Sequence, residues 1–391
     1  MPLLKGARAD LWCRYAASPR LKLSMNRMSY LHRRLGASLA CIGLLGTVVA
    51  PAAGQTPPVS AGALPVAADK AVPETKAGER DIHQWLARMH DASRKRSYVG
   101  TFVVSSADGS MASSRIWHVC DGEQQMERIE SLTGTPRSVF RRNDQVITFL
   151  PQSRIAKIEK RDSLDMFHNL GRPGKSDIAS YYTARLVGDE RVAGFDADVV
   201  LLQPRDALRF GYKVWSEKKT GLVITLQTLA PDGKVLEQAA FSELDMDAPV
   251  KVDKLAQLMS KTTGYKVVKP ELVRTTAIHE GWQLKTAVAG FQPVGCYKRP
   301  VLPSGGTLPP GTPPDNNMQW TFSDVLATVS LFVEAFDAQR HTQEREMTMG
   351  ATQMVMKRVG SDWWLTAVGE VPLPTLRLFA QSLERRKTGP N

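Results

Sequence analysis

Apolar and polar residues alternate from Arg185 to Leu244, in short segments that turn residues separate. Alternation with a period of two is typical of a β-strand with one buried face. The pattern therefore predicts four short antiparallel strands in this stretch. Between segments 221–229 and 234–244, the pair Asp232-Gly233 predicts a type I′ turn, because both residue types tolerate positive φ.

The same alternation occurs earlier in the chain. Before it, residues 81–96 place apolar side chains at three- and four-residue steps, which predicts an amphipathic helix. Together with the four later strands, the earlier segments give about ten strands, and a sheet of that size must curl. We therefore expect a large half-open antiparallel β-barrel packed on helices over residues 81–246. The earlier strands are predicted at 98–105, 115–120, 124–131, 137–142, 145–150 and 154–160.

Residues 163–180 lack a strand pattern. A helical flap over the mouth of the barrel and an ordinary surface loop both fit this composition, so the two interpretations stay open.

The pattern changes after residue 246. Segment 247–264 predicts a linker with a short helix, flanked by Pro249 and Gly264. Residues 265–386 predict a smaller antiparallel α+β domain, so the expected fold class is mainly β with α. Its predicted elements are strands at 282–289 and 318–336, a hairpin of 346–359 and 363–371, and a closing helix at 372–386.

Residues 1–53 differ from the rest of the chain. Leu35 to Ala53 form an apolar run that basic residues precede and small residues end, which is typical of a cleaved secretory signal peptide. Translation from Met25 or Met28 stays open. Residues 54–80 are rich in alanine and proline without periodicity, which predicts a flexible leader.

Two alternatives for the apolar run are less favoured. A retained membrane anchor needs about 18 or more strongly apolar residues, whereas glycines and Pro51 interrupt this run. Lipid attachment at Cys41 would need the usual small-residue box before the cysteine, and Ser38-Leu39-Ala40 departs from it.

Neither the net charge nor the cysteine content indicates a specific binding or catalytic function. The whole chain has a formal charge of +12, but after residue 52 it keeps 43 basic and 38 acidic residues, which is ordinary solvated surface. We therefore expect no nucleic-acid partner. The two cysteines that remain after cleavage, Cys120 and Cys296, either form a disulfide in an oxidising compartment or are two small buried side chains.

The sequence has no arrangement of residues that is typical of an enzyme or of a metal site. The histidines are scattered, and no nucleotide-binding loop or nucleophile elbow occurs. Ser216-Glu217-Lys218-Lys219 and Lys219-Thr220-Gly221 mimic two motifs of penicillin-recognising enzymes, but here they overlap in one turn, whereas those enzymes need them far apart. Asp196 and Asp198 fit a polar turn better than a metal pair. We expect no catalytic residue, no metal and no cofactor.

Four short motifs resemble, in their order and spacing, those of the MucB/RseB family of periplasmic sigma-factor regulators. The resemblance covers roughly residues 81–386, and the motifs are Arg191-Val192-Ala193-Gly194, Pro204-Arg205-Asp206, Arg209-Phe210-Gly211-Tyr212-Lys213-Val214-Trp215 and Thr220-Gly221-Leu222. The residues Arg191, Arg205, Asp206 and Trp215 are interpreted as structural.

The resemblance implies a periplasmic negative regulator of an envelope-stress sigma factor. Such a protein would bind the periplasmic part of an anti-sigma factor of the RseA/MucA type and protect it from proteolysis. Lipid signals, namely lipopolysaccharide or the acyl chains of mislocalised lipoprotein, would release it. The alternatives are a periplasmic carrier of lipid or lipoprotein and a purely structural envelope protein. Self-association into a homo-oligomer stays open.

The resemblance also implies that the first domain has the fold of the lipoprotein carrier LolA, with a groove for acyl chains. A core simply filled by the same side chains is the competing interpretation. We expect replacement of Phe149 by aspartate to weaken lipid binding and to leave partner binding intact. The partner-binding residues are unknown, and the groove candidates are Tyr98, Phe102, Phe140, Phe149 and Phe167.

Overall fold

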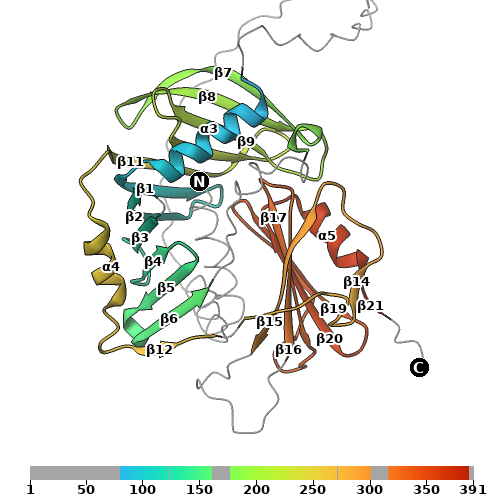
Figure 1. Cartoon of the computed structure of the whole chain (residues 1–391). Helices are drawn as coiled ribbons and strands as arrows, with labels where there is room; N and C mark the ends of the chain where they lie inside the picture. Colours follow the sequence, from blue (N-terminus) through green and yellow to red (C-terminus); the bar gives the residue numbers. More distant parts are fainter. Residues whose placement is uncertain (1–79, 123, 161–176, 271, 301–315, 387–391) are drawn as a thin grey trace, which may run out of the picture. The chain divides into compact units, whose positions relative to one another are not determined.

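The computed structural model describes residues 80–160 and 177–386, apart from residues 123, 271 and 301–315 (Figure 1). Most of these residues form two sheets, one of twelve and one of seven strands. The mainly β fold class expected from the sequence is therefore confirmed. No helix in the described part of the chain has the length and apolar character needed to cross a membrane.

The larger sheet is open, because its outermost strands β7 and β12 each pair with a single neighbour. This agrees with a half-open and not a closed barrel. In spatial order its strands are β12 (Lys266–Val268), β6 (Ile155–Lys160), β5 (Gln145–Leu150), β4 (Ser138–Arg142), β3 (Gln124–Ser131), β2 (Met111–Asp121), β1 (Tyr98–Ser106), β11 (Val235–Met246), β10 (Val223–Leu229), β9 (Gly211–Glu217), β8 (Phe195–Pro204) and β7 (Tyr182–Val192).

The sheet differs from the sequence prediction in strand number. Five strands, not four, lie within the stretch that begins near Arg185, and β12 adds a further strand that pairs in parallel with β6. The predicted type I′ turn is also wrong. Gly233 has a φ of +83°, whereas Asp232 has no positive φ. The NH of Gly233 donates to the Ala230 carbonyl and the NH of Ala230 to the Lys234 carbonyl, so the loop is a longer turn with Pro231 near its start.

Two helices pack on this sheet. Helix α3 (Ile82–Lys95) confirms the predicted amphipathic helix. It begins at Asp81, whose carboxylate accepts from the NH of Gln84, while the Gln84 side chain accepts from the NH of Asp81. This reciprocal cap satisfies two NH groups at the helix start. Helix α4 (Val252–Ser260) confirms the short helix predicted in segment 247–264.

The smaller sheet has its own core, which helix α5 (Leu373–Ser382) covers. Strands β14 (Trp282–Leu284) and β21 (Leu383–Arg385) form a separate two-stranded ladder. In spatial order the seven strands are β13 (Val273–Arg274), β15 (Gln292–Pro300), β16 (Asn316–Ser323), β17 (Thr328–Ala335), β20 (Trp363–Gly369), β19 (Thr352–Val359) and β18 (Arg345–Met349).

Three elements predicted in this region differ in the structure, because a turn interrupts them or strand pairing ends them. Segment 346–359 folds back at Gly350, which has a φ of +57°, and so belongs to two strands. Segment 318–336 turns at residues 324–327. The closing helix ends at Ser382, because the next three residues pair with β14. Of the segment predicted at 163–180, residues 163–176 lie outside the described residues.

Candidate functional site

The five groove candidates do not form one surface. Directly paired residues of antiparallel strands share a face, and successive residues of one strand alternate. Tyr98 pairs with His118, His118 with Glu127, and Glu127 with Arg141. Tyr98 therefore shares a face with Arg141 and lies opposite to Phe140, the residue before it. Phe167 lies outside the described residues.

Tyr98 and Phe102 belong to a packed cluster that includes Ala92 of helix α3. Both aromatic rings lie edge-on against the ring of Phe241, at centroid distances of 6.1 and 6.2 Å. Their exposed fractions are only 4% and 5%. In this structure they fill a core next to the end of α3 and do not line an open groove.

His118 adds a buried titratable group to this cluster. Its ring stacks on Tyr98 at a centroid distance of 5.0 Å, and its Nδ1–H donates to the Arg96 carbonyl at 2.9 Å. Burial lowers the pKa of His118 to about 4 from an ordinary value of 6.5, although the bond to Arg96 opposes the shift. The imidazole is therefore neutral in the folded protein at neutral pH.

This depressed pKa predicts acid sensitivity. The unfolded chain takes up a proton near pH 6.5 while the folded chain takes one up near 4, so stability falls as pH drops through that window. Between about pH 7.5 and about pH 5, His118 should cost about 2 kcal/mol of unfolding free energy. Urea unfolding at both pH values measures this. His118→Gln should make the difference smaller by a similar amount; an unchanged difference would contradict the assignment.

Phe140 and Phe149 lie in a different cluster, under helix α4. Their rings meet edge to face at 5.7 Å, and Tyr265 packs on Phe149 at 5.1 Å. Leu255 and Met259 supply the buried face of α4. This pair of candidates therefore holds the segment after β11 against the sheet.

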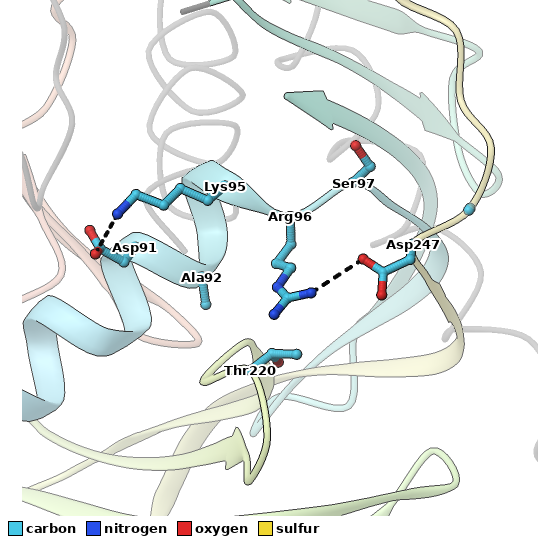
Figure 2. A pocket seen from close by; sticks show the side chains of 8 residues that line it. Asp91, Ala92, Lys95, Arg96, Ser97, Thr220 and Asp247 are labelled. Atoms are coloured by element: carbon cyan, nitrogen blue, oxygen red, sulfur yellow. Dashed lines mark hydrogen bonds and ion pairs between the residues drawn. The ribbon is translucent and has the colours of Figure 1, made fainter. Parts of the chain in front are cut away.

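A cavity of about 580 Å³ opens beside the cluster of Tyr98 and Phe102 (Figure 2). Figure 2 shows the guanidinium of Arg96 reaching across it to Asp247, at 3.5 Å, while Lys95 pairs with Asp91 at 2.8 Å along the helix. Ala92 belongs both to the cavity wall and to the cluster of Tyr98 and Phe102. The other lining residues are Ser97, Thr220 and Ala248.

A buried ion pair connects the two sheets. Arg209 lies just before β9 and Asp324 just after β16, and both side chains are fully buried. The Arg209 Nε atom donates to the Asp324 carboxylate at 2.7 Å. Burial raises the pKa of the Asp324 carboxyl. Four donors hold its charged form, namely Arg209, the Tyr182 hydroxyl and the NH groups of Leu326 and Ala327.

The rest of the Arg209 guanidinium is also bound. Its Nη2 atom donates to the Ala289 carbonyl at 2.6 Å and its Nη1 atom to Asp206. The guanidinium also lies over the rings of Tyr181 and Phe291, at 4.4 and 4.8 Å. Arg209 therefore joins residues of both sheets. The sequence pattern did not indicate that Arg209 joins the two sheets, because a polar residue at this position fits the ordinary alternation of a strand.

The turn that carries Asp324 is held in an unusual conformation. Val325 has a φ of +90°, which a β-branched residue adopts only under constraint. Val325 and Leu326 are buried in the same cluster as Trp85, Leu86 and Met89 of helix α3. Packing against α3 thus holds this turn together with the ion pair.

Three of the four motif residues that were interpreted as structural form side-chain hydrogen bonds. The Arg205 Nε atom donates to the Ala179 carbonyl, the Asp206 carboxylate accepts from the NH of Leu208, and the Trp215 indole donates to Glu190. For Arg191 the structure gives its place opposite Asp196 in the β7–β8 hairpin. These contacts fit the structural interpretation of the motifs.

The two motifs that mimic an enzyme form a capped turn. The Ser216 hydroxyl donates to the Gly221 carbonyl at 3.0 Å. The Glu217 carboxylate accepts from the NH groups of Lys219 and Thr220. Within the described residues, no group of three or more His, Cys, Asp or Glu side chains is arranged to hold a metal ion.

Cys120 and Cys296 are both free thiols in this structure. Cys120 lies on β2 of the larger sheet and Cys296 on β15 of the smaller one. Burial raises the pKa of the Cys296 thiol to about 11.

Comparison with known families identifies the family of this chain. Residues 81–259 match the MucB/RseB N-terminal domain and residues 276–384 match the MucB/RseB C-terminal domain. The chain belongs to the MucB/RseB family. Members include the sigma factor AlgU regulatory protein MucB of Pseudomonas aeruginosa, which is 30% identical over 326 residues, 80% of this chain and 93% of that protein. The sigma-E factor regulatory protein RseB of Haemophilus influenzae is 24% identical, over 79% of this chain and 93% of the relative.

Solved structures of MucB resemble this MucB/RseB protein along most of its length. The crystal structure of MucB in complex with MucA(peri) is 28% identical, with a TM-score of 0.58, and the match covers 78% of this chain and 98% of the other. The crystal structure of MucB without a named partner is 25% identical, with a TM-score of 0.53, over 77% of this chain and 97% of the other.

Proposed function

We propose that the protein is a periplasmic negative regulator of an envelope-stress sigma factor. It binds the periplasmic region of a membrane anti-sigma factor of the RseA/MucA type and shields that region from proteolysis. The observation that carries the proposal is the family match over both domains, together with the likeness to MucB, which was crystallised with MucA(peri). The signal-like segment at the start of the sequence supports export to the periplasm.

The contacts between the two sheets support a binding role for both. Arg209 and Asp324 are fully buried, and Thr375 of α5 donates to the Leu208 carbonyl at 2.9 Å. A partner that contacts residues near these bonds would meet side chains that are already held in place and would pay little ordering cost.

We further propose that lipid weakens the hold on the anti-sigma factor. A ligand releases a partner only if it binds the free protein better than the complex, by a few kcal/mol for a useful switch. The cavity beside Ala92 is the proposed entrance, because it adjoins the cluster of Tyr98 and Phe102. An acyl chain would separate these packed side chains, and Lys95 and Arg96 would meet the headgroup.

A carrier of lipid or lipoprotein is the second candidate, favoured by the apolar cluster at Tyr98. A carrier would need only the larger sheet, whereas the family match continues through the smaller one. The regulatory function accounts for both parts of the chain.

Capture from the native envelope tests the proposal. The chain from Gly54 onward, which keeps every described residue, is immobilised and exposed to detergent-solubilised envelope of its own organism. Mass spectrometry should find a single-pass anti-sigma factor, and added lipid should compete with its capture. Capture of lipoproteins without an anti-sigma factor would overturn the regulatory function in favour of the carrier.

A further inference from the structure

Exposed lysines lie on helix α4 and at both of its ends. Its buried positions, Leu255 and Met259, are four residues apart and define the inner side. Lys254 lies within the helix, Lys251 and Lys261 lie at its N-cap and C-cap, and all three side chains are exposed. The helix is thus held to the sheet by Leu255 and Met259, while exposed cations lie on it and at its two ends.

The chain after α4 extends this charge. Segment 251–269 contains five lysines and one aspartate, Asp253, a formal charge of +4. Lys266 and Lys269 are exposed, and the NH of Lys266 donates to the carbonyl of the exposed Arg154, which lies just before β6. We call the five lysines together with Arg154 the basic face.

These lysines have no anionic partner among the described residues. Within the described ranges none of the five forms an ion pair, in contrast to several lysines elsewhere on the surface. Lys218 pairs with Asp189, Lys234 with Asp232 and Lys285 with Glu384. Within the part of the chain that the structure describes, unpaired cations therefore gather on α4, at its two ends and on the segment that follows it.

We propose that the basic face docks on a membrane surface that carries anionic lipid headgroups. Five of its six cations are lysines, which act as separate point charges and suit a diffuse field of phosphate headgroups. A specific acidic peptide is more often bound by paired arginine forks in a shaped pocket. Val267, 43% exposed, lies between Lys266 and Lys269 and can enter the headgroup layer.

This docking is independent of the proposed function and of the lipid entrance beside Ala92. It would hold the protein at the membrane in which a single-pass partner is anchored. Because the buried side of α4 stays on the sheet, the contact is electrostatic and depends on salt.

Vesicle sedimentation tests the proposal with the chain from Gly54 onward, so that the apolar run before it cannot bind lipid. Vesicles of phosphatidylcholine alone are compared with vesicles that contain phosphatidylglycerol. The protein should bind the anionic vesicles, and about 0.5 M salt should abolish the binding. The triple variant Lys254→Gln, Lys261→Gln, Lys266→Gln should bind about 100-fold more weakly.

The control variant Lys218→Gln, Lys234→Gln, Lys285→Gln has the same change in net charge and should bind as the parent does. Thermal unfolding verifies that both triple variants are folded. Equal loss in both would overturn the proposal, because net charge and not this face would then decide. Undiminished binding by the variant Lys254→Gln, Lys261→Gln, Lys266→Gln would overturn it too. A lack of binding to anionic vesicles together with lysine-dependent binding of polyglutamate would also overturn it, because that result would indicate an acidic protein partner.

Discussion

Replacing Asp324 by alanine is expected to lower the free energy of unfolding by about 3–5 kcal/mol, because it removes the fully buried counter-ion of Arg209 and leaves only the partly exposed Asp206 to pair with that guanidinium. Arg209 has no exposed surface and cannot turn to solvent without disrupting the rings of Tyr181 and Phe291 around it. The loss should also loosen the contact between the two sheets, since this pair joins residues from both. Chemical denaturation, together with limited proteolysis of the segment between α4 and β14, measures the two effects.

An exposed ion pair is the matched control. Arg377 and Glu346 form a two-pronged pair on the surface, where solvent screens the charges. Glu346→Ala should therefore change stability far less than Asp324→Ala. Replacing both members of the buried pair by apolar residues, Arg209→Met with Asp324→Leu, should recover part of the loss. Equal stabilities of Asp324→Ala and Glu346→Ala would contradict the structural importance of the buried pair.

Replacing Phe149 by alanine should cost about 3–5 kcal/mol, because it opens a hole between the sheet and helix α4. Phe149→Asp should cost at least as much, since a carboxylate would lie among Phe140, Tyr265 and Met259. Hydrogen exchange should show helix α4 exchanging faster in both variants. On the exposed side, Met111 is 70% accessible, so Met111→Asp should leave stability nearly unchanged.

The Phe149 variants also test the hypothesis of a selective lipid-binding role that the sequence suggested. That hypothesis expects Phe149→Asp to lose lipid binding while the fold and partner binding stay intact. The packing under α4 predicts a general loss of stability. A Phe149→Asp protein with the stability of the parent would contradict the packing argument and return Phe149 to the groove.

Secondary-structure elements could be predicted from the sequence where neighbouring residues alone determine them. The apolar stripe after Asp81 defined helix α3, and the cap at Asp81 fixes where it begins. The residue at which α5 ends could not be predicted, because Leu383 pairs with Leu284, almost a hundred residues earlier in the chain. Tertiary pairing outweighs helix propensity at that point.

The candidate site was less predictable, for two physical reasons. Whether Tyr98 and Phe140 share a surface depends on the register of four successive strands, and a shift of one residue would reverse the answer. The ion pair of Arg209 and Asp324 joins residues 115 positions apart, and a charged residue in an alternating pattern is usually read as solvent-exposed. Nothing local distinguishes such a buried charge from a surface one.

The most direct test of the central claim is the affinity of the chain for the periplasmic region of the anti-sigma factor captured from its own envelope. Calorimetric titration of that purified region into the chain from Gly54 onward should give saturable binding with defined stoichiometry, and a lipid that enters beside Ala92 should weaken it. A purified region that shows no binding, with and without lipid, would contradict the assignment of this protein as an anti-sigma factor regulator.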